Sequence, residues 1–177
     1  MDTVALLREQ LKDAHRLLEA VLEDVTPEMA HWIPPGQANP VGATYAHVVL
    51  TEDRTINGAI QRGTPLYDGA WAGKTGLSEL MPSRGEAWKD YANWTRRLRV
   101  DLPALRTYAA AVYAASDAYL AGLTPDEIAR PRDLSGVGLG QVTLAWILSR
   151  EVIGHVDNIT GEISCLKGLQ GQKGYPT

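Results

Sequence analysis

The sequence predicts an all-α fold, a four-helix bundle with short extra helices in its connections. Four long segments repeat apolar residues at the helical period, and the connections between them carry short helix-start signals. No convincing strand pattern interrupts them. The chain has 177 residues, of which 45% are hydrophobic and 21% charged. These values fit one well-packed domain that covers residues 1–177.

Composition excludes several classes of function. The formal net charge is −4, so the chain lacks the basic footprint of a nucleic-acid-binding protein. No run of about eighteen apolar residues is present, so we expect no membrane partner. The N-terminus lacks the basic start of a signal peptide. Cys165 is the only cysteine, which rules out an intrachain disulfide and favours a reducing, cytoplasmic location.

The first helix is predicted over residues 3–24. Its buried face is an apolar stripe made of Leu7, Leu11, Ala14, Leu18, Val21 and Leu22. His15 lies at the border of this stripe, where it is either a histidine beside an interhelical groove or a residue that lines a site. Thr26-Pro27-Glu28 then forms a helix start with threonine as the N-cap. The short turn ends near His31, which we interpret as a loop residue rather than a ligand.

The second long helix is predicted from about residue 41 to about residue 61. It carries His47 and Thr51 one turn apart. The apolar neighbours of His47 indicate partial burial, which suits a hydrogen-bonded core histidine as well as a metal ligand. Glu52 and Asp53 are interpreted first as part of a solvated patch. Alternatively, Glu52 is a carboxylate that orients an imidazole.

The middle of the chain, residues 63–85, is rich in glycine and proline and has no helical period. Its apolar residues between Tyr67 and Met81 indicate an ordered loop. Long loops of this kind often cover a site or an interface. An accessory helix is predicted over residues 86–99, and the arginine cluster at its end is interpreted as solvated surface.

The third long helix is predicted over residues 102–123, with aspartate and proline start signals. Thr124-Pro125-Asp126 repeats the threonine–proline–acid start seen earlier in the chain, which suggests an internal pseudo-repeat. A glycine-rich stretch, residues 133–140, leads into the last helix. It is not a phosphate-binding loop, because the glycine spacing is wrong and no Lys-Ser or Lys-Thr follows. The last helix is predicted over residues 141–166.

This last helix carries the strongest chemical signal in the sequence. Its apolar stripe consists of Leu148, Val152, Ile159, Ile163 and Leu166. His155 lies in the stripe and Glu151 lies one turn earlier, so the two side chains project side by side. Burying an ionised carboxylate is unfavourable unless a partner or a metal compensates its charge. The pair is therefore a clue to a metal site, which would need a third ligand from elsewhere in the chain.

Two motifs together resemble those of the DinB-like superfamily. Gly42-Ala43-Thr44-Tyr45-Ala46-His47, followed by Glu52-Asp53, is similar to the second-helix signature of that superfamily. The run from Arg150-Glu151-Val152 through His155 to Gly161-Glu162-Ile163 is similar to its fourth-helix signature. The resemblance covers nearly the whole chain. It implies a four-helix bundle, often dimeric, with a divalent metal between the second and fourth helices.

The resemblance leaves two alignments of the metal ligands. Many members use one histidine from the second helix and two, four residues apart, from the last. One alignment places His155 and Ile159 at those two positions, which leaves an incomplete site because isoleucine cannot bind a metal. The other pairs Glu151 with His155, as in the glutamate–histidine variant of the mycothiol-dependent maleylpyruvate isomerases. We prefer the second alignment because it supplies three ligands, His47, Glu151 and His155.

Two imidazoles, one carboxylate and an open position match a catalytic zinc site better than a closed structural one. Zinc or nickel is the expected metal, although iron accepts similar ligands. The sequence thus favours a metal-dependent enzyme of the thiol-dependent transferase or isomerase type, or a hydrolase, with a small-molecule substrate and a low-molecular-weight thiol as a candidate cofactor. The alternative is a non-catalytic ligand-binding or structural dimeric bundle with a degenerate metal site. A homodimer is expected from the resemblance and from the apolar loop at Tyr67–Met81.

Overall fold

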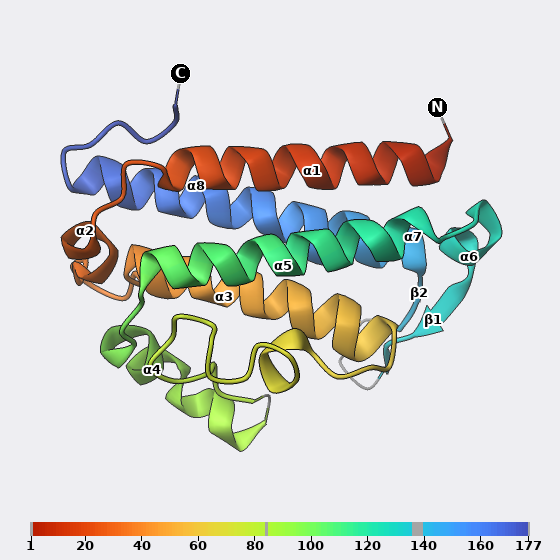
Figure 1. Cartoon of the computed structure of the whole chain (residues 1–177), viewed down its shortest axis with the longest axis horizontal. Coiled ribbons are helices and arrows are strands. Elements are labelled where there is room, and N and C mark those ends of the chain that lie inside the picture. The colour runs from red at the N-terminus through yellow and green to blue at the C-terminus, as the bar shows by residue number, and fades with distance from the viewer. Residues whose placement is uncertain (1, 84, 136–139, 177) are drawn as a thin grey trace.

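The computed structural model describes residues 2–83, 85–135 and 140–176. Within these residues, four long helical segments form a bundle (Figure 1). Their bounds are α1 Thr3–Leu22; α3 Val41–Asp53, continued by the π-helical segment η1 Arg54–Ile60; α5 Leu102–Ala121; and α7 Leu144–Trp146, continued by the π-helical segment η5 Ile147–Ile153 and by α8 Gly154–Leu169. The predicted all-α four-helix bundle is confirmed. No helix in the described ranges is both long and apolar enough to serve as a membrane span.

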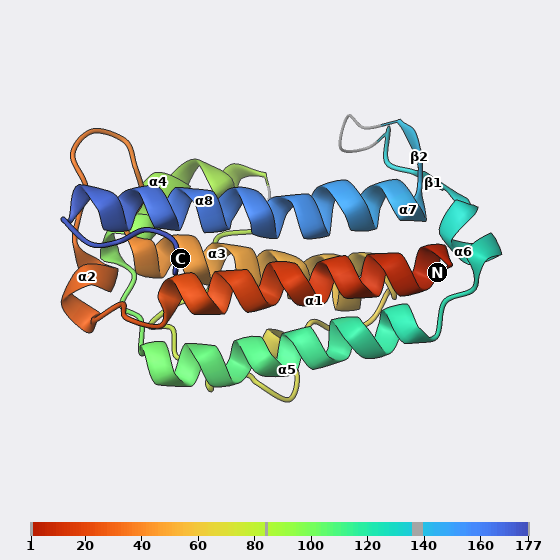
Figure 2. The ribbon, with the colours of Figure 1, turned by 90° about the horizontal axis from the view of Figure 1, so that it is seen from above.

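The long helices run in two directions. α1 and α8 run one way along the bundle, and α3 and α5 run the opposite way (Figures 1 and 2). α1 packs against α5 and α8, and α3 packs against the same two helices. Because α3 and α5 are parallel, the chain between them must return along the bundle. This return, which we call the crossover (residues 61–101), contains η2 Leu66–Asp68, η3 Glu86–Asp90 and α4 Tyr91–Arg97.

Two short helices repeat the same start signal. α2 (Pro27–His31) and α6 (Pro125–Ala129) each follow a long helix and begin with a threonine N-cap and a proline in the first turn. Each precedes a helix with a π-helical segment, so the two halves of the chain share an order of elements. His31 is the last residue of α2, and its Nε2 accepts a hydrogen bond from the Val100 N–H at 2.9 Å. His31 therefore lies in a short helix and not in the predicted loop, and its contact with Val100 is structural.

The C-terminal end of α1 is held by cations from two neighbouring helices. Lys167 Nζ on α8 donates to the Val21 carbonyl at 2.7 Å and pairs with Asp24. Arg106 on α5 donates to the Leu22 carbonyl. Positive groups stabilise the carbonyl end of a helix. Since Lys167 is only 3% exposed, this contact fixes α1 to α8 from inside the core.

Buried Asp53 attaches the crossover to the bundle. Its carboxylate accepts hydrogen bonds from the N–H groups of Leu66 at 2.9 Å and Tyr67 at 3.1 Å, and from the Tyr108 hydroxyl at 2.6 Å. Asp53 is 0% exposed and Glu52 is 3% exposed. The prediction that these two carboxylates belong to a solvated patch is therefore wrong. They are buried because donors from distant segments satisfy them.

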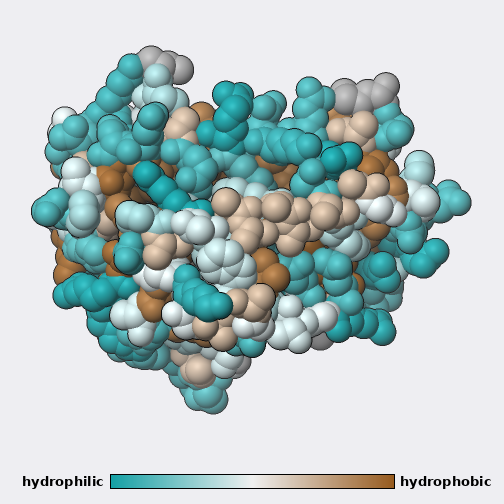
Figure 3. All heavy atoms as spheres, in the orientation of Figure 1, coloured by the Kyte–Doolittle hydropathy of each residue, from teal (hydrophilic) through white to brown (hydrophobic). Residues whose placement is uncertain are grey.

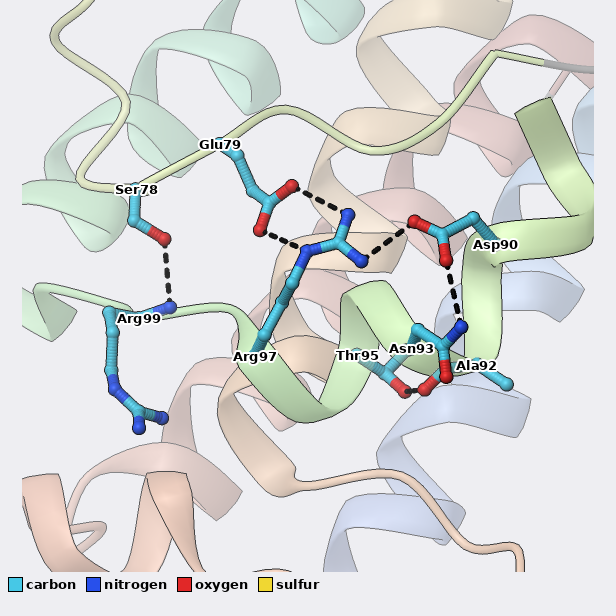
Figure 4. A network of polar contacts seen from close by, with 8 residues as sticks. All are labelled: Ser78, Glu79, Asp90, Ala92, Asn93, Thr95, Arg97 and Arg99. Atoms are coloured by element: carbon cyan, nitrogen blue, oxygen red, sulfur yellow. Dashed lines mark hydrogen bonds and ion pairs between the residues drawn. The ribbon is translucent and has the colours of Figure 1, made fainter.

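An ion-pair network orders the outer part of the crossover (Figure 4). Arg97 donates to both carboxylate oxygens of Glu79, at 2.8 and 2.9 Å, and to Asp90 at 2.7 Å. Asn93 adds a hydrogen bond to Asp90 at 2.9 Å. The accessory helix predicted over residues 86–99 is present as η3 followed by α4 and ends at Arg97. Its arginine cluster is thus partly engaged in ion pairs.

The apolar residues of the crossover pack inward. Those in contact with the core include Leu66, Tyr67, Trp71, Leu77 and Met81. The chain therefore covers most of this loop itself, which removes one of the two reasons for expecting a dimer. Figure 3 shows a largely hydrophilic face with a band of weakly hydrophobic atoms where α5 lies, and exposed alanines of α5 include Ala110, Ala114 and Ala118.

The chain before the last helix differs from its prediction. A short antiparallel hairpin, β1 Pro131–Asp133 and β2 Gln141–Thr143, joins α6 to α7. No strand pattern was visible there because three-residue strands are too short to show alternation. The last helix therefore begins at Leu144, with Thr143 as its N-cap. Of the predicted glycine-rich stretch, residues 136–139 lie outside the described residues.

Candidate functional site

His47 and His155 meet at the seam between α3 and α8. Their Nε2 atoms are 3.2 Å apart, the ring centroids are 5.0 Å apart, and the ring planes lie at 88°. The two residues are 108 positions apart in the chain, so the fold alone creates this contact. The structure thus brings together two of the three residues predicted to bind a metal.

Side chains of the crossover cover His47. Its Nδ1 lies 3.2 Å from the Met81 sulfur, and the Tyr91 ring meets the imidazole edge-on at 5.5 Å. The Trp88 ring stacks on Tyr91 at 4.5 Å. Sulfur is a weak acceptor, so a proton on Nδ1 can donate to it and leave the Nε2 lone pair directed at His155. Sequence reasoning missed these residues and gave only the general expectation that a long loop covers a site.

Burial keeps both imidazoles neutral near pH 7. Removal from water, with smaller contributions from His155 and Arg54, lowers the pKa of His47 to about 4. Burial also lowers the pKa of His155, against the opposing charges of Glu151 and Glu52. The neutral imidazole is the form that offers a lone pair to a metal or accepts a proton.

Glu151 lies in the same cavity wall but apart from the imidazole pair. It is half-buried on η5, one turn before His155, and its charge acts on the pKa of His155. In the described part of the chain, no group of three or more His, Cys, Asp or Glu side chains lies close enough to hold a metal ion. The predicted third ligand thus lines the same cavity as the pair without completing a three-ligand cluster in the described part of the chain.

The spacing of the imidazole pair fits one metal ion. Two nitrogen ligands at roughly 2.0–2.1 Å from a tetrahedral ion lie about 3.3 Å apart, close to the 3.2 Å between these Nε2 atoms. Neutral imidazole nitrogens suit zinc or nickel. A hydrogen bond from a protonated Nε2 to an unprotonated one gives a similar distance. The pair is thus competent for metal binding and is also satisfied without an ion.

A cavity of about 960 Å³ opens beside the two imidazoles. Its lining includes His47, Thr51, Arg54, Glu151 and His155, together with residues of the hairpin and the crossover. Thr51 Oγ1 is buried and has no hydrogen-bond partner among the described residues. The volume lies near the upper end of the range for small-molecule sites. Both π-helical segments contribute to the wall, and such segments are frequent at functional sites.

Arg62 and Arg132 also line this cavity. Arg62 lies two residues after the end of η1 and has a positive φ of 56°, and Arg132 lies on β1 opposite Val142. Gly63 after Arg62 indicated a turn, but no sequence pattern placed the turn and the hairpin at one cavity.

His15 belongs to a separate buried cluster. Its Nε2 lies 2.8 Å from Glu52 Oε2, and the Ser116 hydroxyl donates to Glu52 Oε1 at 2.6 Å. The Tyr113 ring stacks on the His15 ring with a centroid distance of 3.7 Å. Glu52 therefore does contact an imidazole, as one alternative expected, but the imidazole is that of His15 and not that of His47.

Comparison with known proteins places these observations in a family. The sequence profile of the DinB superfamily matches residues 10–156. Among curated proteins, none matches this sequence. The crystal structure of the conserved protein of locus from Enterococcus faecalis is similar, with a TM-score of 0.79 and 22% sequence identity over 97% of this chain and 99% of that chain. This likeness concerns the fold alone. Because the profile spans most of the chain, including both histidines of the pair, the protein belongs to the DinB superfamily.

Proposed function

We propose that the protein is a metal-dependent enzyme of the thiol-dependent transferase or isomerase type, in which His47, Glu151 and His155 hold a divalent zinc or nickel ion. The observation that carries the proposal is the approach of two neutral imidazoles to 3.2 Å beside a cavity of about 960 Å³. Superfamily membership supports it, since the resemblance implies a metal between the second and fourth long helices.

Glu151 supports the proposal as the third ligand. It lies one turn before His155 on the same cavity wall. Several side-chain torsions separate its carboxylate from the helix, so the carboxylate can approach the imidazoles without a change in the backbone. Its negative charge would also offset the positive charge of Arg54, which already acts on both imidazoles. A metal cation beside Arg54 needs such compensation.

A divalent ion at this position would supply Lewis acidity, which lowers the pKa of a coordinated thiol or water toward neutrality. The residues of the chain prepare the site for that chemistry. The low pKa of His47 keeps its lone pair available. Trp88 and Tyr91 shield one side of the imidazole from water. Thr51 Oγ1 offers a hydrogen bond to a bound thiol or substrate, because it has no partner in the described part of the chain.

The second candidate function is a non-catalytic ligand-binding bundle with a degenerate metal site. The observation in its favour is that the two imidazoles already satisfy each other. No three-ligand cluster exists among the residues that the structure describes. In this case the cavity binds a small molecule without chemistry.

Metal analysis of untagged protein, purified without chelator, separates the two candidates. We expect stoichiometric metal in the unmodified protein and none in His155→Ala, while circular dichroism stays helical. Glu151→Gln should weaken metal binding, because it keeps the shape of the side chain and removes its charge. Glu162→Gln is the matched control, since Glu162 lies on the same long helix and is exposed. Metal-free unmodified protein would favour the second candidate.

Cobalt substitution tests the thiol-dependent part of the proposal. Adding 2-mercaptoethanol to the cobalt-loaded protein should produce a thiolate-to-cobalt absorption band, because the metal site keeps an open position. The band should be absent from His155→Ala. A cobalt-loaded protein whose spectrum is unchanged by the thiol would argue for a hydrolase instead.

We also propose a homodimer, on the strength of the superfamily resemblance. Sedimentation velocity at micromolar concentrations should show the dimer. A single monomeric species over the whole concentration range would contradict this.

A further inference from the structure

Positive side chains from separate elements converge on the cavity beside the imidazole pair. Arg54 begins η1, Arg62 follows the end of η1, and Arg132 lies in the middle of β1. All of these residues line the one cavity. The protein as a whole is acidic, with a formal net charge of −4. A concentration of arginines in one cavity therefore departs from the general charge of the molecule.

Arg54 carries positive charge toward the inner end of this cavity. Its guanidinium acts on both imidazoles and contributes to the lowering of the pKa of His47 and of His155. A charge that reaches both rings lies near the atoms where the proposed chemistry takes place. A bound ligand with a negative group pointing inward would meet this charge.

Arg62 and Arg132 also line the cavity, and the charge of Arg132 acts on Tyr119 and Glu127. Among the described residues, neither side chain makes a hydrogen bond or an ion pair, in contrast to Arg8, which pairs with Asp117 at 2.9 Å. Arg62 is exposed and Arg132 is half-buried. The pairing of β1 with β2 fixes the backbone of Arg132. Guanidinium groups that make no hydrogen bond among the described residues provide donors in the planar arrangement that carboxylate and phosphate groups prefer.

The acidic residues of the cavity do not cancel this positive charge. The described lining contains Asp133 and Glu151. Asp133 accepts a hydrogen bond from the Ser135 N–H at 2.9 Å, and Glu151 lies beside His155 at the proposed metal site. The arginine charges thus exceed the carboxylate charges, and a divalent ion would add to the excess.

We propose that the cavity binds a small organic anion through its carboxylate or phosphate groups, which Arg62 and Arg132 hold while Arg54 attracts a further negative group toward the imidazoles. This inference names the substrate class of the site in the proposed function, and it rests on that proposal only for the statement that the anion is a substrate. The arginines would bind the anion whether or not a metal is present.

Calorimetric titration with succinate, and with its uncharged analogue succinamide, tests the proposal on the unmodified protein. Succinate should bind at least about tenfold more tightly than succinamide, because charge-assisted hydrogen bonds to arginine are the stronger kind. Inorganic phosphate is the second probe. Tighter binding of phosphate than of succinate would assign a phosphate group to the ligand, and the reverse order would assign a carboxylate. If neither anion binds more tightly than succinamide, the proposal is wrong.

Substitutions locate the binding groups. Arg62→Gln and Arg132→Gln should each weaken succinate binding by about tenfold, with unchanged circular dichroism. Arg130→Gln is the matched control, because Arg130 is exposed, lies two residues from Arg132 and does not line the cavity. Equal weakening by the control would show non-specific attraction and overturn the proposal. If an arginine variant fails to fold, the comparison of succinate with succinamide still decides.

The outcome is independent of the metal analysis. Selective succinate binding by a protein that holds no metal would refute the proposal of a metal-dependent enzyme and would support the anion site. Stoichiometric metal without selective anion binding would refute the anion site and would support the proposal of a metal-dependent enzyme.

Discussion

The molecule contains two histidine–glutamate pairs, His15 with Glu52 and His155 with Glu151, and they differ in how many of their hydrogen-bonding groups find partners within the protein. The first pair belongs to a buried group of His15, Glu52, Tyr113 and Ser116, which we call the inner cluster. There, Glu52 Oε2 lies 2.8 Å from His15 Nε2, Glu52 Oε1 accepts a hydrogen bond from the Ser116 hydroxyl at 2.6 Å, and the Tyr113 ring stacks on the imidazole. In the cavity, the carboxylate of Glu151 influences the pKa of His155 but belongs to no metal-binding cluster among the described residues. The same two residue types thus form a closed network on one side and an open arrangement on the other.

The difference separates structural polar groups from groups available for function. A buried carboxylate with matched donors stabilises one arrangement of the core, and removing a partner leaves the other groups unsatisfied. A carboxylate, a hydroxyl and two imidazoles beside a large cavity can satisfy their remaining capacity only with a ligand, water or metal. Substitutions in the His15 cluster are therefore expected to lower the free energy of unfolding, and substitutions around His47 are expected to weaken ligand or metal binding instead.

The largest expected contrast comes from truncating the two glutamates. Glu52→Ala should lower the free energy of unfolding by about 3 kcal/mol, because it leaves buried His15 and Ser116 without their acceptor. Glu151→Ala should lower it by less than about 1 kcal/mol, because that side chain is half-buried at a cavity. Urea denaturation of both variants measures the contrast. Similar losses for both glutamates would mean that the cavity carboxylate is also structural.

The next effect concerns the attachment of the crossover that covers the site. Asp53→Asn should lower the free energy of unfolding by about 2 kcal/mol, because an amide has one acceptor oxygen where the carboxylate has two. The donors at risk are the N–H groups of Leu66 and Tyr67. Limited proteolysis within the crossover should become faster. Asp68→Asn, at an exposed position, is the control, and an equal loss there would contradict the assignment.

Most of the fold could be predicted from sequence because its long helices carry the 3.6-residue period along their own length. The crossover and the hairpin could not. The carboxylate of Asp53 can be buried because it accepts hydrogen bonds from N–H groups 13 and 14 positions further along the chain. Its charged neighbours in the sequence favoured a solvated position instead. The strands of the hairpin are three residues long, which is too short for a period to show.

The candidate site could be predicted in part for the same reason. His47 and His155 each stand on a periodic helix, and the superfamily resemblance paired those helices. The position of the Glu151 carboxylate was harder to predict, because helical spacing assumed an α-helix and this residue lies in the π-helical segment η5, where the angle between successive side chains differs. Arg62 and Arg132 come from a turn and a hairpin, which the fold alone brings to one cavity.

A smaller contrast compares a satisfied hydroxyl with an unsatisfied one. Ser116→Ala should lower the free energy of unfolding by about 1.5 kcal/mol, because Glu52 loses a buried donor. Thr51→Val should change it by no more than about 0.5 kcal/mol, since Thr51 Oγ1 has no partner among the described residues and valine keeps the shape of threonine. Thermal unfolding of the two variants provides the measurement. A larger loss for Thr51→Val would reveal a structural bond at that hydroxyl.

The smallest effect lies at the outer edge of the inner cluster, where Asp117 pairs with Arg8 at 2.9 Å and with Lys12 at 3.3 Å. The hydrogen bond from Arg8 is the main reason that the pKa of Asp117 lies below its ordinary value of 3.8. A carboxyl group with a lower pKa in the folded state contributes stability that is fully present above the unfolded pKa and is lost as the pH falls through the folded pKa. Asp117→Asn should therefore lower the free energy of unfolding at pH 7 by less than about 1 kcal/mol, since the pair is partly exposed and screened. The difference from the unmodified protein should shrink as the pH falls below 3.8.

Asp13→Asn is the control, because its carboxylate side chain is 65% exposed, and it should change stability less at every pH. A loss for Asp117→Asn that persists unchanged in acid would mean that packing around His15, and not the ion pair, is what this residue supports.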